Sequence, residues 1–99
     1  MGQSFKERVY NVCAKIPKGR VSTYFGIARK IGSLKSARAV GNALNKNSNT
    51  KKIPCHRVVK SNGFVGGYAF GTRAKIKRLK SEGVKVSTKG FIDLDEFGV

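Results

Sequence analysis

The sequence predicts one mainly α-helical domain that carries a small β-hairpin and a helix-turn-helix motif of winged-helix-like type. Apolar residues recur at helical spacing in four separate segments. A short turn that contains glycine separates the second and third segments, and an Asn-Gly pair stands between two short apolar runs, as in a tight hairpin. A length of 99 residues suits a single domain, which we expect over residues 1–99.

The first predicted helix covers about residues 5–15. Ser4 precedes it as a cap, and Pro17 ends it because proline cannot continue a helix. Its apolar residues fall on one face: Phe5, Val9, Cys13 and Ile16. Cys13 is therefore interpreted as a small buried hydrophobe and not as a reactive thiol.

The second and third predicted helices cover residues 23–31 and about 36–44. Ser22 is expected to cap the second helix, and Gly32 is expected to end it. Two short helices joined in this way are typical of a helix-turn-helix, whose second helix enters a DNA groove with its first residues, here near Arg38. The pattern alone also fits an ordinary helical hairpin.

The remaining segments are shorter. Val58-Val59 and Phe64-Val65 predict the two strands of the hairpin, with Asn62-Gly63 as its turn. A last helix is expected over about residues 73–81 with Thr72 as its cap. The tail, residues 84–99, is expected to form a strand pair or a cover for the core.

Charge is the strongest global signal. Lys and Arg number 21 against five acidic residues, which gives a formal net charge of +16. Such an excess favours a polyanionic partner, and nucleic acid fits better than an anionic membrane because no basic amphipathic segment has an aromatic face. A basic protein from a salt-rich or hot environment is the alternative. We expect an intracellular protein, because no apolar run resembles a signal peptide or a membrane span.

Cys55 is the one cysteine outside a helical apolar face, and His56 and Arg57 follow it. A thiolate is the reactive form of cysteine, and a neighbouring base or positive charge favours it. Adjacent side chains on an extended strand point apart, so His56 would reach Cys55 only in a tight turn or through water. On two residues alone, a chance juxtaposition is the stronger interpretation. One His and two distant Cys make no ordinary zinc site, so we expect neither metal nor cofactor.

The wider context of Cys55 changes that balance. Residues 54–58 read Pro-Cys-His-Arg-Val, which resembles the active-site signature of the O6-alkylguanine-DNA alkyltransferases, also called methylated-DNA–protein-cysteine methyltransferases. Further residues match that family at its spacings: Tyr24, the run Arg38-Ala39-Val40-Gly41, Asn47, Val65, Gly66, Tyr68 and Glu82. The match extends over residues 24–82, so the resemblance implies the fold of the family's C-terminal catalytic domain.

The resemblance implies a role for each matching residue. The implied catalytic residues are Cys55, His56, Glu82, Tyr24 and Asn47. The implied DNA-binding residues are Arg38, Tyr24, Ala37, Ala39 and Gly41. The implied substrate pocket comprises Val58, Tyr68, Ala69, Val65 and Gly66. In these roles Arg38 fills the gap left by a flipped guanine, small residues admit the third helix to the minor groove, and Cys55 takes the alkyl group.

The activity expected from this resemblance is single-use repair of O6-alkylguanine in double-stranded DNA by a monomer without an obligate protein partner. The family commonly has Pro where Ser48 stands and Ser where Ala69 stands, and its extra N-terminal domain, sometimes with zinc, is not matched. Three alternatives stay open. An alkyltransferase-like sensor binds lesions without repair, but such proteins carry Trp in place of Cys55; the others are a basic architectural DNA-binder and a cysteine hydrolase.

Overall fold

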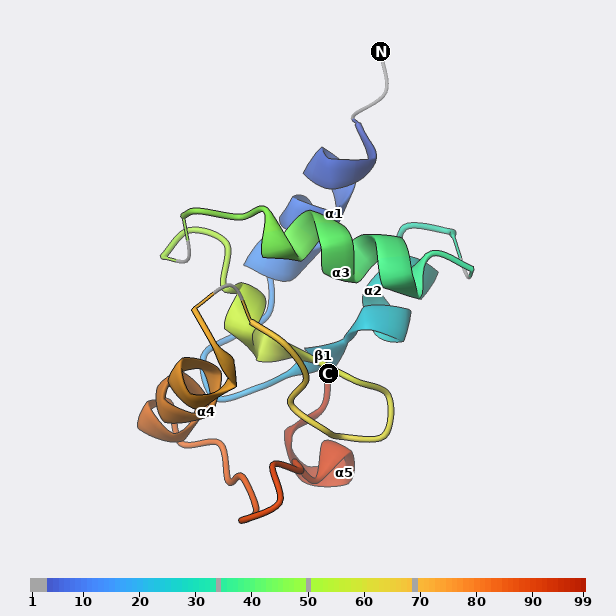
Figure 1. Ribbon diagram of the computed structural model, residues 1–99. Coiled ribbons are helices and arrows are strands. Elements are labelled where there is room, and N and C mark those ends of the chain that lie inside the picture. Colours follow the sequence, from blue (N-terminus) through green and yellow to red (C-terminus); the bar gives the residue numbers. More distant parts are fainter. Residues whose placement is uncertain (1–3, 34, 50, 69) are drawn as a thin grey trace.

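The computed structural model describes residues 4–33, 35–49, 51–68 and 70–99 and confirms a mainly helical fold with one short two-stranded sheet. The elements in chain order are α1 (Phe5–Ala14), β1 (Ser22–Thr23), α2 (Tyr24–Lys30), α3 (Ala37–Asn45), the 3-10 turn η1 (Cys55–Arg57), β2 (Val58–Val59), α4 (Thr72–Ser81) and α5 (Leu94–Phe97). Figure 1 shows α1, α2 and α3 gathered in the upper half of the molecule and α4 and α5 in the lower half.

The first three helices form as their periodicity predicts, within a residue or two at each end. Ser4 caps α1 in a reciprocal capping box with Glu7, whose backbone and side chain both bond to it. Gly32 follows α2 with a φ of 75°, which a residue with a side chain rarely adopts. α2 packs against α3, and α1 packs against both, so the helix-turn-helix rests on the first helix.

The caps of two helices differ from the prediction. Thr23, not Ser22, caps α2, and its hydroxyl accepts a bond from the Gly26 amide at 2.8 Å. The helix begins at Tyr24, so the residue directly before it is Thr23, and Ser22 lies one residue too early to be the cap. Thr72 is the first residue of α4 and not its cap, and its hydroxyl donates to the Gly66 carbonyl at 3.3 Å.

The predicted β-hairpin is correct in its turn and wrong in its strand pairing. The Lys60 amide donates to the Phe64 carbonyl at 2.9 Å, which closes the turn. β2, however, pairs in parallel with β1, and Phe64 forms an antiparallel bridge with Phe91 of the tail. Two residues on each side of a turn make too few ladder bonds to hold a hairpin, so each side pairs with a more distant segment.

Buried residues form two clusters that meet at β2. The helical cluster contains Val9, Cys13, Ile16, Ile27, Ala28, Ile31, Val40, Ala43, Leu44, Cys55 and Val58. The tail cluster contains Val21, Val59, Val65, Leu79, Val84, Ile92 and Phe97. Val58 and Val59 are neighbours in the chain and belong to different clusters, because alternate side chains of a strand point to opposite faces.

The tail covers the core, one of the two expected arrangements. Val84, Ile92 and Phe97 are buried in the tail cluster. The turn glycine Gly63 fixes the tail, since its carbonyl accepts from the Ile92 amide at 2.9 Å. Gly63 has a φ of 90°, and a Cβ there would lie 2.5 Å from the Ile92 carbonyl oxygen. Only glycine fits at this junction without strain.

Candidate active site

Cys55 begins η1, directly before β2, and is only 5% exposed. Asn47, which lies just beyond the end of α3, reaches it. The Asn47 side-chain amide lies 3.6 Å from Cys55 Sγ and also donates to the Ile53 carbonyl at 2.8 Å. The Asn47 oxygen accepts from the Asn49 amide at 3.0 Å. Asn47 thus ties the segment before the cysteine to the end of α3, close to the sulfur.

A tight turn is one of the two conditions under which His56 was expected to serve Cys55, and η1 is such a turn. His56 is fully buried. Its Nε2 atom lies 3.0 Å from Oε1 of Glu82, although its N–H does not point along that line, and Nδ1 has no hydrogen-bond partner among the described residues. Three of the predicted catalytic residues therefore lie close together: Cys55 and His56 belong to η1, and Glu82 contacts His56.

Arg57 is the last residue of η1, and its side chain pairs with Glu82 and not with Cys55. Its Nε and Nη2 atoms donate to the two carboxylate oxygens of Glu82 at 2.9 and 2.7 Å. Its Nη1 atom donates to the Ile16 carbonyl at 2.8 Å. A two-pronged guanidinium–carboxylate pair fixes the carboxylate in orientation as well as in place.

The pKa shifts in this cluster suit a neutral imidazole beside a charged carboxylate. Burial lowers the pKa of His56, and the opposing effect of Glu82 does not restore it. Burial alone would raise the pKa of Glu82, but the hydrogen bonds from Arg57 and the contact with His56 outweigh it and leave that pKa below its usual value. At neutral pH, His56 can therefore accept a proton.

Cys13, the other free cysteine, allows a comparison of thiol environments with Cys55. It is fully buried in the helical cluster, and burial, reinforced by the nearby Cys55, raises the pKa of its thiol to about 12. A thiol with such a pKa carries almost no thiolate at neutral pH. The interpretation of Cys13 as a buried hydrophobe is consistent with this environment.

Sequence reasoning missed Lys75 of α4, which is fully buried. Its Nζ atom donates to the Val58 carbonyl at 2.7 Å, to the Gly67 carbonyl at 3.0 Å and to the Tyr24 hydroxyl at 3.3 Å. Burial raises the pKa of Tyr24, with a further contribution from Cys55. The signal that could have revealed Lys75 is its position four residues before the buried Leu79, on the same helix face.

The predicted pocket residues do not all meet at Cys55. Val58 shares the helical cluster with Cys55, whereas Val65 is buried in the tail cluster. The Tyr68 ring packs edge-on against His56 at 6.5 Å between centroids, and its hydroxyl accepts from Arg78 at 3.0 Å. A Cβ on Gly66 would lie 3.7 Å from the Tyr24 hydroxyl. Ala69 lies outside the described residues.

The predicted DNA-binding residues come from α3 and from Tyr24 at the start of α2. Arg38 and Ala39 are exposed, and Ala37 is half-buried. Tyr24, Ala37 and Arg38 line one hollow of about 340 Å³ together with Lys60. A Cβ on Gly41 would lie 3.7 Å from the Tyr24 ring, so Gly41 leaves room for that ring against α3.

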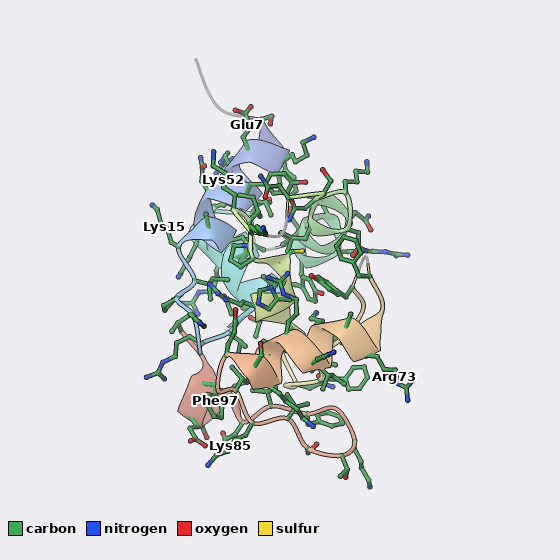
Figure 2. All side chains as sticks on the ribbon, turned by 90° about the vertical axis from the view of Figure 1, so that its left-hand side faces the viewer. Glu7, Lys15, Lys52, Arg73, Lys85 and Phe97 are labelled. Carbon is green, nitrogen blue, oxygen red and sulfur yellow. The ribbon has the colours of Figure 1, made fainter. Side chains whose placement is uncertain are left out.

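Positive charge also surrounds the rest of the domain. In Figure 2, blue nitrogen tips project on all sides, and the labelled Lys15 and Arg73 extend in opposite directions. The net charge of +16 therefore belongs to the whole surface. The hollow beside Arg38 is therefore distinguished by the residues that line it, Tyr24 and Ala37 among them, and not by positive charge alone.

Comparison with known proteins identifies the family. Residues 4–84 match the family model described as 6-O-methylguanine DNA methyltransferase, DNA binding domain. The chain belongs to this family. A methylated-DNA–protein-cysteine methyltransferase of Saccharolobus islandicus is 48% identical over 83% of this chain and 52% of its own length. A bifunctional methyltransferase/endonuclease of Picrophilus torridus is 40% identical over 90% of this chain and 30% of its own length.

One solved structure matches the chain almost end to end. S. pombe Atl1, in complex with damaged DNA containing O6-carboxymethylguanine, has a TM-score of 0.84 and 33% identity over 98% of this chain and 96% of its own. Mycobacterium tuberculosis OGT in complex with DNA has a TM-score of 0.78 and 37% identity over 84% of this chain and 51% of its own. The chain thus spans only part of the transferases that it matches, but nearly all of Atl1.

Within the described residues, no helix combines the length and the apolar character that crossing a membrane requires.

Proposed function

We propose that the chain repairs DNA by transferring an alkyl group from O6-alkylguanine to its own Cys55, once per molecule and without a cofactor. The observation that carries the proposal is the cluster of Cys55, His56 and Glu82, in which burial lowers the pKa of the His56 imidazole and Arg57 fixes the Glu82 carboxylate. A neutral base beside a thiol is what a cysteine nucleophile needs. The proposed partner is double-stranded DNA, and we propose that the protein is intracellular, DNA-associated and monomeric.

The α3 face supplies the support for DNA binding. Arg38 is exposed at the start of this helix and lines a hollow with Tyr24. A base can react with a buried thiol only after it leaves the stack, and Arg38 would fill its place while Tyr24 turns the neighbouring phosphate. Ala37 and Ala39 leave α3 narrow enough for the minor groove. Val58, Gly66, Tyr68, Ala69 and Val65 are the proposed surroundings of the flipped base.

The chemistry is one displacement. The thiol proton of Cys55 passes through a water to His56, whose charge Glu82 stabilises, as in a hydrolase triad. The thiolate attacks the alkyl carbon, the S–C bond forms, and the bond between that carbon and O6 breaks. The released electron pair returns to the guanine ring, which takes a proton from the Tyr24 hydroxyl. Asn47 holds the turn that carries Cys55. The product is a stable thioether, so each molecule acts once.

A lesion sensor is the second candidate. The observation that favours it is the end-to-end match with S. pombe Atl1, whose structure contains damaged DNA. Cys55 favours transfer instead, because a sensor of the alkyltransferase-like type has Trp at this position. The two functions differ in whether a covalent bond forms.

The deciding experiment is intact-protein mass spectrometry after incubation with a duplex that carries one O6-methylguanine. We expect a gain of one methyl group on Cys55, its loss in Cys55→Ala and its retention in Cys13→Ala, the matched control. Tight binding to the lesion without a mass gain would establish the sensor. Neither a mass gain nor a lesion preference would leave a basic DNA-binder, and repeated turnover would contradict single use.

A further inference from the structure

Arg78 of α4 is a half-buried arginine whose side-chain partner is a phenol. Its Nη1 atom donates to the Tyr68 hydroxyl at 3.0 Å. Glu82 lies four residues further along the chain, at the spacing of an ordinary helical ion pair. Arg57, however, already bonds to both oxygens of that carboxylate, and His56 contacts one of them. Within the described ranges, Arg78 therefore has no carboxylate partner, and its charge is directed at Tyr68.

Tyr68 is held at both of its ends. Its backbone carbonyl accepts from the Gly71 amide at 3.0 Å, in the loop before α4, and its hydroxyl accepts from Arg78 on α4 itself. Between these two points the ring stands edge-on to His56, with 6.5 Å between the centroids and 68° between the planes. Edge-to-face contacts depend on orientation, so a ring that swung about its Cα–Cβ bond would lose this one. The bond from Arg78 restrains that motion.

We propose that Arg78 is a positioning residue for alkyl transfer: by donating to the Tyr68 hydroxyl, it holds the tyrosine ring against His56 as a fixed wall of the site that receives the flipped guanine. The inference rests on the proposed transfer to Cys55, and it adds a residue that touches neither the thiol nor the guanine. A guanidinium suits this role because it is planar and always charged, which gives its bond a fixed direction.

The same guanidinium also acts on the proton acceptor. Burial is the main cause that lowers the pKa of His56, and the charges of Arg78 and Arg57 lower it further while Glu82 opposes them. The titratable and charged groups around the imidazole are Glu82 and Arg78 from α4 and its end, Arg57 and Cys55 from η1, and Tyr68 from the loop before α4. Removal of the Arg78 charge should therefore raise the pKa of His56.

The test compares single-turnover methyl transfer from a duplex that carries one O6-methylguanine by wild type, Arg78→Leu, Tyr68→Phe and the double variant. Rates over a series of protein concentrations give the maximal rate and the protein concentration at which half of it is reached. Lys80→Leu, which removes an exposed positive charge from the same helix, is the matched control. Binding to the undamaged duplex and thermal melting are measured for every variant.

At pH 8 we expect Arg78→Leu to raise the half-saturating concentration roughly tenfold, as befits the loss of one hydrogen bond from a charged donor. Its binding to the undamaged duplex should change no more than that of Lys80→Leu, because Arg78 acts through Tyr68 and not on phosphates. Tyr68→Phe should have an effect similar to that of Arg78→Leu. The double variant should be no worse than the weaker-binding single variant, because both changes remove the same bond.

A second measurement follows the imidazole directly. His56 is the only histidine of the chain, so one imidazole signal in the NMR spectrum reports its titration. In Arg78→Leu the midpoint should move to higher pH, and the acid limb of the transfer rate should move with it, because a protonated imidazole cannot accept the thiol proton. Arg78→Lys keeps the charge, so its midpoint should stay closer to that of the wild type than to that of Arg78→Leu. Lys80→Leu should titrate as the wild type does.

Additive losses in the double variant, or an unchanged histidine titration in Arg78→Leu, would overturn the role of Arg78 and leave the transfer itself intact. An equal loss of binding to the damaged and undamaged duplexes would do the same and would make Arg78 a phosphate contact. Where Arg78→Leu does not fold, a Tyr68→Phe variant with the half-saturating concentration of the wild type has the same consequence. Absence of transfer in the wild type would overturn both the proposed function and this inference, so the two failures are distinguishable.

Discussion

The helical cluster and the tail cluster differ in how their residues come together. In the helical cluster most residues come from α1, α2 and α3, which follow one another in the first 45 residues. In the tail cluster, Val21 meets Phe97 from the opposite end of the chain, and the Val21 amide donates to the Phe97 carbonyl at 2.9 Å. The first cluster is built from neighbouring helices, and the second from distant, largely irregular segments.

The candidate active site lies on the boundary between these two clusters. Cys55 and Val58 pack into the helical cluster, while α4, which carries Lys75 and leads to Glu82, contributes Leu79 to the tail cluster. The nucleophile and its supporting charges thus come from different halves. Function in this domain depends on how the halves are joined, and the following four changes test that dependence.

Removal of residues 84–99 should have the largest effect. It deletes three buried apolar side chains, each worth about 1.5–3 kcal/mol, from a domain whose total stability is on the order of 5–15 kcal/mol. We expect the shortened chain to lose its cooperative thermal transition by circular dichroism. A shortened chain that melts like the full chain would show that the helical cluster stands alone.

A matched pair of point variants separates packing from length. Ile92→Ala removes a side chain that is 5% exposed, whereas Phe91→Ala removes its neighbour, which is 41% exposed. The first should cost about 2–3 kcal/mol and the second less than about 1 kcal/mol. Equal losses would contradict the assignment of Ile92 to the tail cluster.

Glu82→Gln should have the next largest effect, because Glu82 ends α4 and binds both His56 and Arg57 of η1. Leaving the Arg57 charge without its partner should lower the free energy of unfolding at pH 7 by about 2 kcal/mol, less than a fully buried pair would lose. Alkyl transfer should slow as well. Glu96→Gln, an exposed acid of α5, is the control and should leave the melting temperature unchanged.

The effect of Glu82→Gln should depend on pH. The pKa of Glu82 is lower in the folded chain than its ordinary value of 4.5, so the stability from its charge is present above pH 4.5 and is lost as the pH falls through the folded value. The difference in melting temperature between wild type and variant should therefore shrink in acid. A constant difference from pH 7 to pH 3 would contradict the ion pair.

Gly63→Ala should have the smallest effect of the four. The new Cβ would meet the Ile92 carbonyl oxygen at a positive φ, which costs about 1–3 kcal/mol and loosens the tail. Gly67→Ala is the control, because that Cβ meets nothing within 4 Å and no positive φ is required. Chemical denaturation should show a lower midpoint for Gly63→Ala alone; equal midpoints would place the strain elsewhere.

Local patterns predicted the helices well and the sheet poorly. The spacing of Val9 and Cys13 and the cap at Ser4 are contained within α1 itself, so sequence reasoning finds them. The partner of β2 is β1, which lies 36 residues earlier at Ser22 opposite Val58, and no local signal records that distance. The Asn-Gly turn was predicted correctly because a turn depends only on neighbouring residues. The same reliance on neighbouring residues led to the wrong prediction that the two flanking strands pair with each other.

The candidate site shows the same difference between residues that the sequence reveals and residues that only tertiary packing reveals. The family resemblance supplied Cys55, His56 and Glu82, and the model brings these residues together; their catalytic roles stay a prediction. Lys75 was missed because four Lys and Arg residues surround it on a basic helix, where a lysine is ordinarily solvated. Burial of a lysine is a tertiary property, and here it is created by the packing of α4 against η1, β2 and the start of α2.

The single guanidinium of Arg57 has a consequence for the order of folding. It bonds to Ile16 at the end of α1 and to Glu82 at the end of α4, so contacts that span 41 and 25 residues meet at one side chain next to the nucleophile. Contacts that close long loops form late, after neighbouring helices have packed. We therefore expect a partly folded chain to hold its three helices before Arg57 and Glu82 fix the surroundings of Cys55.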